Sequence, residues 1–179
     1  MPRLRFRWVL PHAQKGPLAR WDLRVKEFMA HHKVVVAWDL DIADFSSGRY
    51  TRGHKWSFDG GAVVEGSSSP HVVPVPLSVE SAVDPEEAFI ASLSSCHMLS
   101  FLYEAWKAKF VVKSYRDEAI GVLERIAQGR MAMTRVTLRP VIEFGDRTPT
   151  AEELDHLHHL AHETCFIANS VKTEIIIEY

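Results

Sequence analysis

The sequence DPEEAFIASLSSCHMLSFLYEAWK, residues 84–107, decides the architecture of this chain. Asp84 can cap a helix, Pro85 suits its first turn and Glu87 completes a capping box, so a helix is predicted to run to about Lys107. Apolar side chains recur on every side of this helix: Phe89, Ile90, Leu93, Met98, Leu99, Phe101, Leu102 and Trp106. A helix of this kind is buried in a large core or at a subunit interface. We therefore expect burial on both sides and a homodimer.

Strand patterns lie on both sides of this central helix. Segments 33–41, 50–58 and 62–65 precede it and are separated by turn signals at residues 46–48 and 59–61. Two long strands are predicted after it, at 114–126 and 131–144. A second helix at 151–164 has a capping box formed by Thr150 and Glu153, and a last strand follows at 172–179. The order βββ–α–ββ–α–β groups the strands together, which favours an α+β architecture with an antiparallel sheet.

Composition narrows the classes of function. The chain has 179 residues, of which 46% are hydrophobic and 25% charged, as in an ordinary globular domain. Its net charge of −2 provides no general attraction to nucleic acid or an anionic membrane. No apolar run approaches the roughly 18 residues of a transmembrane helix. We expect a cytoplasmic protein with neither nucleic acid nor membrane as a partner.

The first thirty residues differ from the rest. They contain seven basic residues, namely Arg3, Arg5, Arg7, Lys15, Arg20, Arg24 and Lys26, against two acidic residues, Asp22 and Glu27. Transit peptides are rich in arginine but also in serine, and this segment is not rich in serine. The interpretation is an N-terminal extension of unknown role at 1–30 before a domain at 31–179, or a true start at Met29.

Two cysteines, Cys96 and Cys165, are the candidates for chemistry. They can be inert core residues, metal ligands or redox groups. Cys96 lies in the middle of the predicted helix, where the helix dipole is too weak to stabilise a thiolate. A reactive Cys96 therefore needs a cation from elsewhere in the fold. The neighbouring His97 is a poor candidate, because adjacent helix residues do not face each other.

The second helix offers a competing metal hypothesis. Four histidines crowd it: His156, His158, His159 and His162. His158, His162 and Cys165 fall on one helical stripe, and two histidines with a thiolate can hold zinc. The stripe lacks the catalytic glutamate of the HExxH pattern, so a solvated or interface-facing helix is the alternative.

Several segments resemble the OsmC/Ohr family (osmotically inducible protein C and organic hydroperoxide resistance proteins), and its OsmC-like branch in particular. The resemblance covers about residues 31–179 and rests on the order and spacing of segments 50–52, 59–61, 84–88 and 94–97, and of Cys165 followed by 169–171. It implies an intertwined α+β dimer with a long buried central helix and with its sites at the subunit interface.

The resemblance also implies roles for four residues. Cys96 matches the peroxidatic cysteine and Cys165 the resolving cysteine. Arg52 matches the arginine that stabilises the thiolate, and Glu86 matches the glutamate that holds this arginine. Many family members have proline directly after the resolving cysteine, where this chain has Phe166. That departure leaves the formation of a Cys96–Cys165 disulfide open.

Glu86 raises a geometric question, because the residues between it and Cys96 span about 15 Å of a continuous helix. Either the helix breaks, or Glu86 serves the partner's site, or Arg52 bridges the gap.

The implied activity is a thiol-dependent peroxidase without cofactors. It would reduce organic hydroperoxides, and hydrogen peroxide less well, through a Cys96 sulfenic acid, a Cys96–Cys165 disulfide and an external thiol reductant. Trp56, Met98, Phe101 and Tyr103 are available for an apolar pocket, although core packing explains any one of them. The alternatives are a non-catalytic binding protein on the same fold and a His/Cys metal-binding protein.

Overall fold

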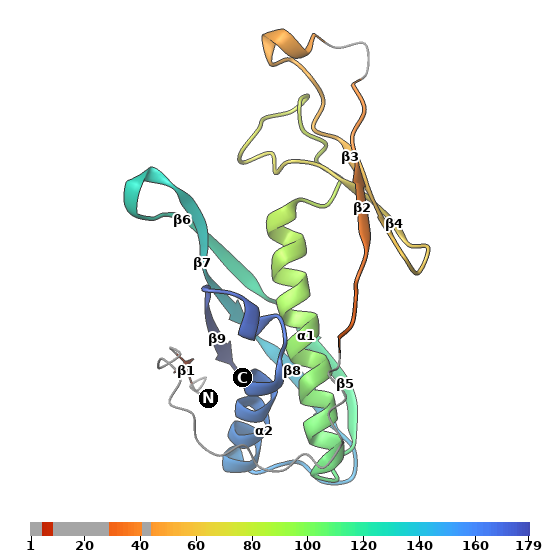
Figure 1. The fold of residues 1–179 in the computed structure, drawn as a ribbon. Helices are drawn as coiled ribbons and strands as arrows, with labels where there is room; N and C mark the ends of the chain where they lie inside the picture. Colours follow the sequence, from red (N-terminus) through yellow and green to blue (C-terminus); the bar gives the residue numbers. More distant parts are fainter. Residues whose placement is uncertain (1–4, 9–28, 41–43) are drawn as a thin grey trace. The chain divides into compact units, whose positions relative to one another are not determined.

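Two units make up the chain in this computed structural model, which describes residues 5–8, 29–40 and 44–179. Unit 1 comprises Met1–Val9 and Glu86–Tyr179, and unit 2 comprises Leu10–Pro85. Figure 1 shows their helices and strands, coloured along the sequence. The mixed α+β architecture that the sequence predicts is confirmed.

Unit 1 is built on a four-stranded sheet in the order β1-β9-β7-β6. The strands are β1 (Arg5–Trp8), β9 (Glu174–Glu178), β7 (Met131–Leu138) and β6 (Ile120–Arg125). β9 pairs antiparallel with β1 but parallel with β7. The other two pairs of this sheet are antiparallel, as the sequence predicts, and the β7–β9 pair is the parallel exception. It is possible because the connection into β9 passes through a helix, and parallel strands need a long crossover connection.

The two long strands predicted after the central helix are each broken in two. The segment 114–126 forms β5 (Val112–Asp117) and β6, and the segment 131–144 forms β7 and β8 (Pro140–Phe144). β5 pairs only with β8, in a ribbon of its own. The break arises because the Asp117 carboxylate accepts the Arg139 backbone N–H at 2.5 Å, while Pro140 has no N–H to donate.

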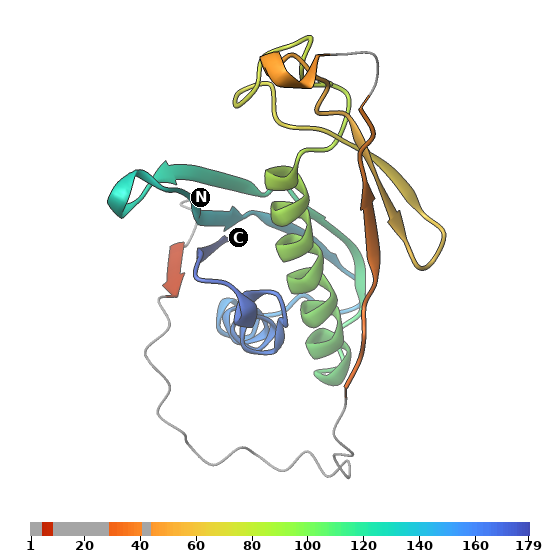
Figure 2. The same cartoon turned by 45° about the horizontal axis from the view of Figure 1, so that its top comes forward.

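Both helices of unit 1 lie where the sequence predicts them. α1 spans Pro85–Lys107 without a break, and α2 spans Ala151–Thr164. The capping box of α2 is present, because Thr150 Oγ1 accepts from the Glu153 N–H at 3.2 Å and Glu153 Oε2 accepts from the Thr150 N–H at 2.9 Å. Figure 2 shows α2 beside the second half of α1.

Two core clusters of unit 1 follow α1 along its length. The first packs Leu93 against the sheet and comprises Leu93, Val136, Leu138, Cys165, Ala168, Ile175 and Ile177. The second packs the later turns of α1 against α2 and comprises Phe101, Ala105, Phe110, Leu157 and Ala161. Cys96 packs against the first cluster from α1. The helix therefore holds Cys96 against the core that contains Cys165.

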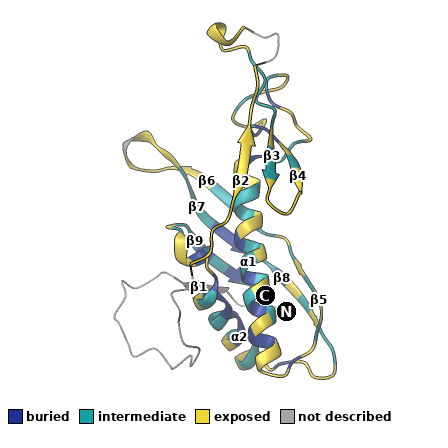
Figure 3. Ribbon diagram, turned by 45° about the vertical axis from the view of Figure 1, so that its right-hand side comes forward, coloured by how far each residue is buried: buried dark blue, intermediate teal, exposed yellow. Residues whose placement is uncertain are grey.

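One face of α1 is left exposed by the chain itself. Leu93 and Phe101 are buried, whereas Leu99 is 61% exposed and Trp106 is 64% exposed. Figure 3 shows exposed positions recurring along α1. The described residues thus bury one side of the apolar helix, and the expected burial of both sides stays a prediction.

Unit 2 contains a three-stranded antiparallel sheet in the order β2-β3-β4. Its strands are β2 (Val34–Ala37), β3 (His54–Phe58) and β4 (Val63–Gly66). β2 and β3 are shorter than predicted, whereas β4 has the predicted length and begins one residue later. Gly61 closes the predicted hairpin turn with a φ of +88°, a conformation that glycine adopts without strain. The predicted turn at 46–48 is the end of a short 3₁₀ helix, Phe45–Ser47.

The N-terminal extension contributes to unit 1. Residues 5–8 form β1, which adds a strand to the edge of β9. The remainder of the predicted extension, residues 1–4 and 9–28, lies outside the described residues. The boundary at residues 30 and 31 stays a prediction.

Candidate active site

Cys96 and Cys165, far apart in the sequence, are brought together in unit 1. Cys96 comes from the middle of α1, and Cys165 is the residue that ends α2. The thiol of Cys165 hydrogen-bonds to Cys96. Two backbone N–H groups of the following turn also reach the sulfurs, from Ile167 to Cys96 Sγ at 3.5 Å and from Ala168 to Cys165 Sγ at 3.4 Å. Both are free cysteines in this structure.

The two sulfurs have different environments. Cys165 is 1% exposed, whereas Cys96 is only half-buried. Burial, and then the hydrogen bond to Cys96, raises the pKa of the Cys165 thiol to about 12. Cys165 is therefore protonated at neutral pH and can donate its proton to Cys96. The Ile167 N–H is a second hydrogen-bond donor to Cys96 Sγ.

The turn after Cys165 is fastened by Asn169 and Ser170. Asn169 Nδ2 donates to the Glu163 carbonyl at 2.9 Å, and its backbone N–H donates to the Cys165 carbonyl at 3.0 Å. Ser170 Oγ donates to the Phe166 carbonyl at 2.7 Å. The Phe166 side chain is 79% exposed, so it does not come between the two sulfurs. The hydrogen bonds of Asn169 and Ser170 thus shape the turn that places the Ile167 N–H beside Cys96.

Asp117 is a supporting residue that the sequence interpretation missed. Ser94, on α1 close to Cys96, donates its hydroxyl to Asp117 Oδ2 at 2.5 Å. The other oxygen of Asp117 holds the Arg139 N–H at the strand break. Asp117 therefore connects α1 to the break between the sheet and the ribbon. The only sign of it in the sequence was a charged residue inside a predicted strand.

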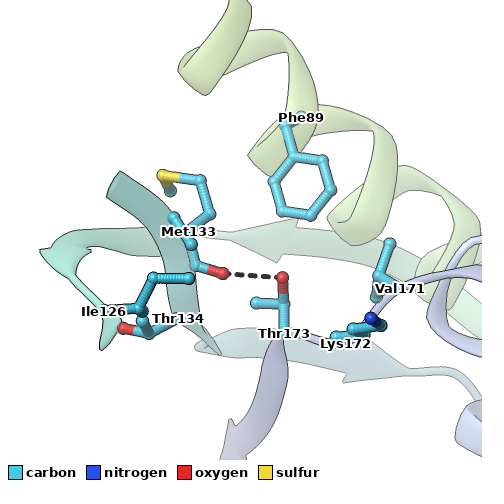
Figure 4. Close-up of a pocket in the computed structure, with 8 residues that line it drawn as sticks. Phe89, Ile126, Met133, Thr134, Val171, Lys172 and Thr173 are labelled. Carbon is cyan, nitrogen blue, oxygen red and sulfur yellow. Dashed lines mark hydrogen bonds between the residues drawn. The ribbon is translucent and has the colours of Figure 1, made fainter. Parts of the chain in front are cut away.

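Two cavities flank the region of the cysteines. One, of about 470 Å³, follows α1 on either side of Cys96 and is lined by Glu87, Ile90, Ala91, Ser94, Ser95, Met98, Asp117 and Ala119. The other, of about 530 Å³, is lined by Phe89, Ile126, Ala132, Met133, Thr134, Val171, Lys172 and Thr173. In Figure 4, Phe89 points from α1 toward Thr173, which donates to the Met133 carbonyl at 2.8 Å. Phe89 and Val171 also pack on the core that contains Cys165.

Of the four residues available for an apolar pocket, Trp56, Met98, Phe101 and Tyr103, the structure assigns Phe101 to core packing. Phe101 is fully buried in the second core cluster and packs its ring on His158 at 4.6 Å. Met98 alone of the four lines a described cavity. The pattern of apolar residues on α1 did not separate core positions from cavity positions.

Glu86 and Arg52 are not placed beside Cys96 by the described contacts. Glu86 lies in the first turn of α1, and because α1 is continuous it is about 15 Å from Cys96 along the helix. A break in the helix is therefore excluded as the way to bring them together. Arg52 belongs to unit 2, where Nη1 donates to the carbonyls of Gly48 at 3.1 Å and Tyr50 at 2.6 Å. The Arg52–Glu86–Cys96 arrangement stays a prediction.

One histidine of α2, His158, forms a buried pair with His97 of α1. His97 Nε2 and His158 Nδ1 lie 3.1 Å apart, and both rings are 2% exposed. His158 also stacks on Tyr179 at 4.1 Å. In the described ranges, no group of three or more His, Cys, Asp or Glu side chains could hold a metal ion. The stripe of His158, His162 and Cys165 is divided instead, because His158 contacts His97 and Cys165 contacts Cys96.

This histidine pair predicts acid sensitivity of the fold. Burial is the main cause that lowers the pKa of His97 and His158 from 6.5 to about 3 each. The unfolded chain binds more protons than the folded chain between these values, so stability is full above pH 6.5 and falls as the pH decreases toward 3. Each histidine lowers the free energy of unfolding by up to about 1.4 kcal/mol per pH unit.

The measurement is denaturant unfolding at neutral pH and at about pH 5, which is still above the ordinary pKa of carboxyl groups. His158→Phe keeps an aromatic ring against Tyr179 and removes one titrating group, so its stability should depend less steeply on pH. An unchanged slope in this variant would contradict the role of the pair.

Comparison with known proteins places the chain in a family. Residues 78–179 match the family described as OsmC-like protein. The chain belongs to the OsmC-like family. It is also similar to the structure of an OsmC-like protein of unknown function from Vibrio cholerae, with 52% sequence identity and a TM-score of 0.80. That match covers 83% of this chain and 97% of the Vibrio chain.

Two more distant structures share the OsmC-like fold. An organic hydroperoxide resistance protein from Elizabethkingia anophelis has 18% identity and a TM-score of 0.63, over 84% of this chain and 94% of its own. The organic hydroperoxide resistance protein OhrB of Bacillus subtilis has 17% identity and a TM-score of 0.59, over 83% and 95%. A comparison with curated proteins finds no match. Among the described residues of this OsmC-like chain, no helix is long and apolar enough to cross a membrane.

Proposed function

We propose that this OsmC-like protein is a thiol peroxidase that reduces organic hydroperoxides with Cys96 and Cys165. The observation that carries the proposal is the contact between a half-buried Cys96 and a buried, protonated Cys165. Free cysteines are common in protein cores, but here two cysteines from distant segments share a hydrogen bond with each other and contact the same turn. The OsmC-like family supports a hydroperoxide-related redox role.

In the first step, the Cys96 thiolate attacks the distal oxygen of the hydroperoxide. The O–O bond breaks, the alcohol leaves after taking up a proton, and Cys96 becomes a sulfenic acid. Cys96 is the attacking sulfur because it is the more accessible of the two, while the raised pKa of Cys165 keeps that thiol protonated. Arg52, held by Glu86, is the proposed cation beside the thiolate.

In the second step, the Cys165 sulfur attacks the sulfenic sulfur of Cys96. An S–S bond forms, the S–O bond breaks and water leaves, so a disulfide closes between the two residues. The existing contact means that this step requires little rearrangement. An external dithiol then reduces the disulfide by exchange and returns both thiols.

The apolar lining of the two cavities supports organic hydroperoxides over hydrogen peroxide as substrates. Both cavities contain apolar side chains, with Phe89 and Met133 in one and Ile90 and Met98 in the other. An alkyl or aryl group gains free energy by leaving water in such surroundings, whereas hydrogen peroxide has no apolar group to bury. A cytoplasmic location remains a prediction from the sequence.

The proposed active form is a homodimer. Leu99 and Trp106 are more than 60% exposed on α1, together with Tyr103 at 44%, and folded monomers rarely expose a contiguous apolar patch of this kind. Light scattering at micromolar concentration should give twice the chain mass of 20.3 kDa. Trp106→Lys should shift the equilibrium toward the monomer. A wild-type species of 20.3 kDa would contradict the dimer.

The experiment that tests the proposed function counts free thiols before and after one equivalent of cumene hydroperoxide. The peroxidase should lose both thiols of the chain in one turnover. A binding protein with unreactive cysteines would lose neither.

A further inference from the structure

The segment around Arg52 is fastened by side chains, and we propose that His54 is a positioning residue for Arg52. His54 fixes the backbone from which the guanidinium extends. This inference rests on the proposed function, in which Arg52 stabilises the Cys96 thiolate. His54 is not proposed to touch the substrate or the sulfur; it acts through Arg52.

The hydrogen bonds of His54 define its tautomer. Trp56 Nε1 lies 2.7 Å from His54 Nε2, and an indole nitrogen only donates, so Nε2 is the acceptor. Nδ1 of a neutral ring then carries the proton, and it lies 2.8 Å from the Arg52 carbonyl, which only accepts. Trp56 thus orients the ring, and the ring donates to the backbone of Arg52. The two hydrogen bonds therefore run in one direction: Trp56 donates to His54, and His54 donates to the Arg52 carbonyl.

Further contacts fix the backbone on both sides of this bond. The Arg52 N–H donates to the Leu77 carbonyl at 2.8 Å. Trp38 Nε1 donates to the Thr51 carbonyl at 2.8 Å, and Trp38 packs edge-on to Tyr50. The Thr51 carbonyl is therefore held by an aromatic N–H from a distant segment of unit 2, and the Arg52 carbonyl by His54, two residues further along the chain. A loop held in this way loses little further freedom when its side chain binds a partner.

The guanidinium of Arg52 is itself pre-oriented. It lies 3.9 Å from the centre of the Tyr50 ring, and Nη1 donates to the carbonyls of Gly48 and Tyr50. An arginine has five N–H donors, so these two bonds leave three for other groups. The remaining fork can grip a carboxylate and a thiolate together, as the proposed function requires of Arg52. Fixing its backbone places that fork.

Gly66 makes room for the His54–Trp56 pair. It lies opposite His54 in the β3–β4 register. A Cβ atom at this position would be 2.6 Å from His54 Nε2 and 3.0 Å from Trp56 Nε1. Gly66→Ala should therefore push the histidine and the indole apart without touching Arg52 directly. It provides an independent way to disturb the pair.

The test measures alkylation of Cys96 by iodoacetamide over a pH series, in a Cys165→Ser background where Cys96 is the only thiol. His54→Phe keeps a flat ring and removes both hydrogen bonds. Because one such bond contributes about 1 kcal/mol, the His54→Phe substitution should slow alkylation of Cys96 at neutral pH about threefold to tenfold. His54→Asn, whose amide can donate to the Arg52 carbonyl, should recover most of the rate. His71→Phe is the matched control, since His71 is exposed in the same unit.

Coupling to Arg52 distinguishes positioning from a general structural role. If His54 acts through Arg52, Arg52→Met and the double variant Arg52→Met/His54→Phe should give superimposable alkylation curves. Trp56→Phe and Gly66→Ala should also slow alkylation of Cys96. These two variants replace His54→Phe in the test if near-UV circular dichroism shows that His54→Phe does not fold.

Three results would overturn the inference: a His54→Phe curve like that of His71→Phe, losses that multiply in the double variant, or an Asn variant no better than Phe. In each case a slow Arg52→Met variant would leave the proposed function standing. If Arg52→Met itself alkylates like the wild type, the role of Arg52 in the proposed function fails, and the positioning role of His54 fails with it.

Discussion

The Cys96→Ser variant should lose hydroperoxide reduction by a factor on the order of a thousand or more, because the thiolate is the proposed nucleophile and a serine hydroxyl is not ionised at neutral pH. Serine is close to cysteine in volume, and Cys96 is only half-buried, so the fold should persist. The measurement is consumption of cumene hydroperoxide with an excess of dithiol, together with far-UV circular dichroism.

Cys165→Ser is the matched control, because it removes the second sulfur and keeps the first. This variant should consume about one equivalent of hydroperoxide and then stop or slow, since Cys96 reaches the sulfenic acid but has no resolving thiol. A Cys96→Ser protein that turns over at the wild-type rate would show that Cys96 is not the nucleophile.

Arg52→Met is expected to have the second largest effect. Methionine keeps much of the side-chain length and removes the charge that should favour the Cys96 thiolate. A nearby cation favours the charged form of a thiol by at least about 1.4 kcal/mol, so peroxide reduction at neutral pH should slow about tenfold or more. Raising the pH should restore part of the rate, because hydroxide then ionises the thiol without help.

Arg52→Lys should rescue only partly, since a point charge cannot grip Glu86 and the thiolate together as a planar fork can. The deciding measurement is alkylation of Cys96 by iodoacetamide against pH in the wild type, Arg52→Met and Arg52→Lys. Superimposable curves for the wild type and Arg52→Met would show that Arg52 does not activate the sulfur.

The helices were predictable because their ends are local in sequence. Pro85 and the capping pair of Thr150 and Glu153 mark positions that depend on a few neighbouring residues. The strand break at Asp117 was not predictable, because it depends on a side chain that accepts the N–H of Arg139, which lies between β7 and β8. The parallel β7–β9 pair depends in the same way on where α2 returns the chain.

The candidate site likewise has features that the sequence predicted and features that only the fold determines. A pattern identified Cys96 and Cys165 as reactive candidates, but only the fold brings them into contact, because no local motif spans the distance between them. The histidines of α2 suggested a metal, and tertiary packing instead pairs His158 with His97 on α1. The backbone N–H of Ile167 was missed because every residue but proline has one, and only the turn places it at the sulfur.

The most direct test of the central claim is a thiol count on the dithiol-reduced wild-type protein, before and after one equivalent of cumene hydroperoxide under denaturing conditions. The account predicts two titratable thiols before treatment and none after it, with an intrachain link between Cys96 and Cys165 that dithiol reverses. Two thiols remaining after treatment, with the hydroperoxide unconsumed, would contradict it and would favour a binding protein with unreactive cysteines.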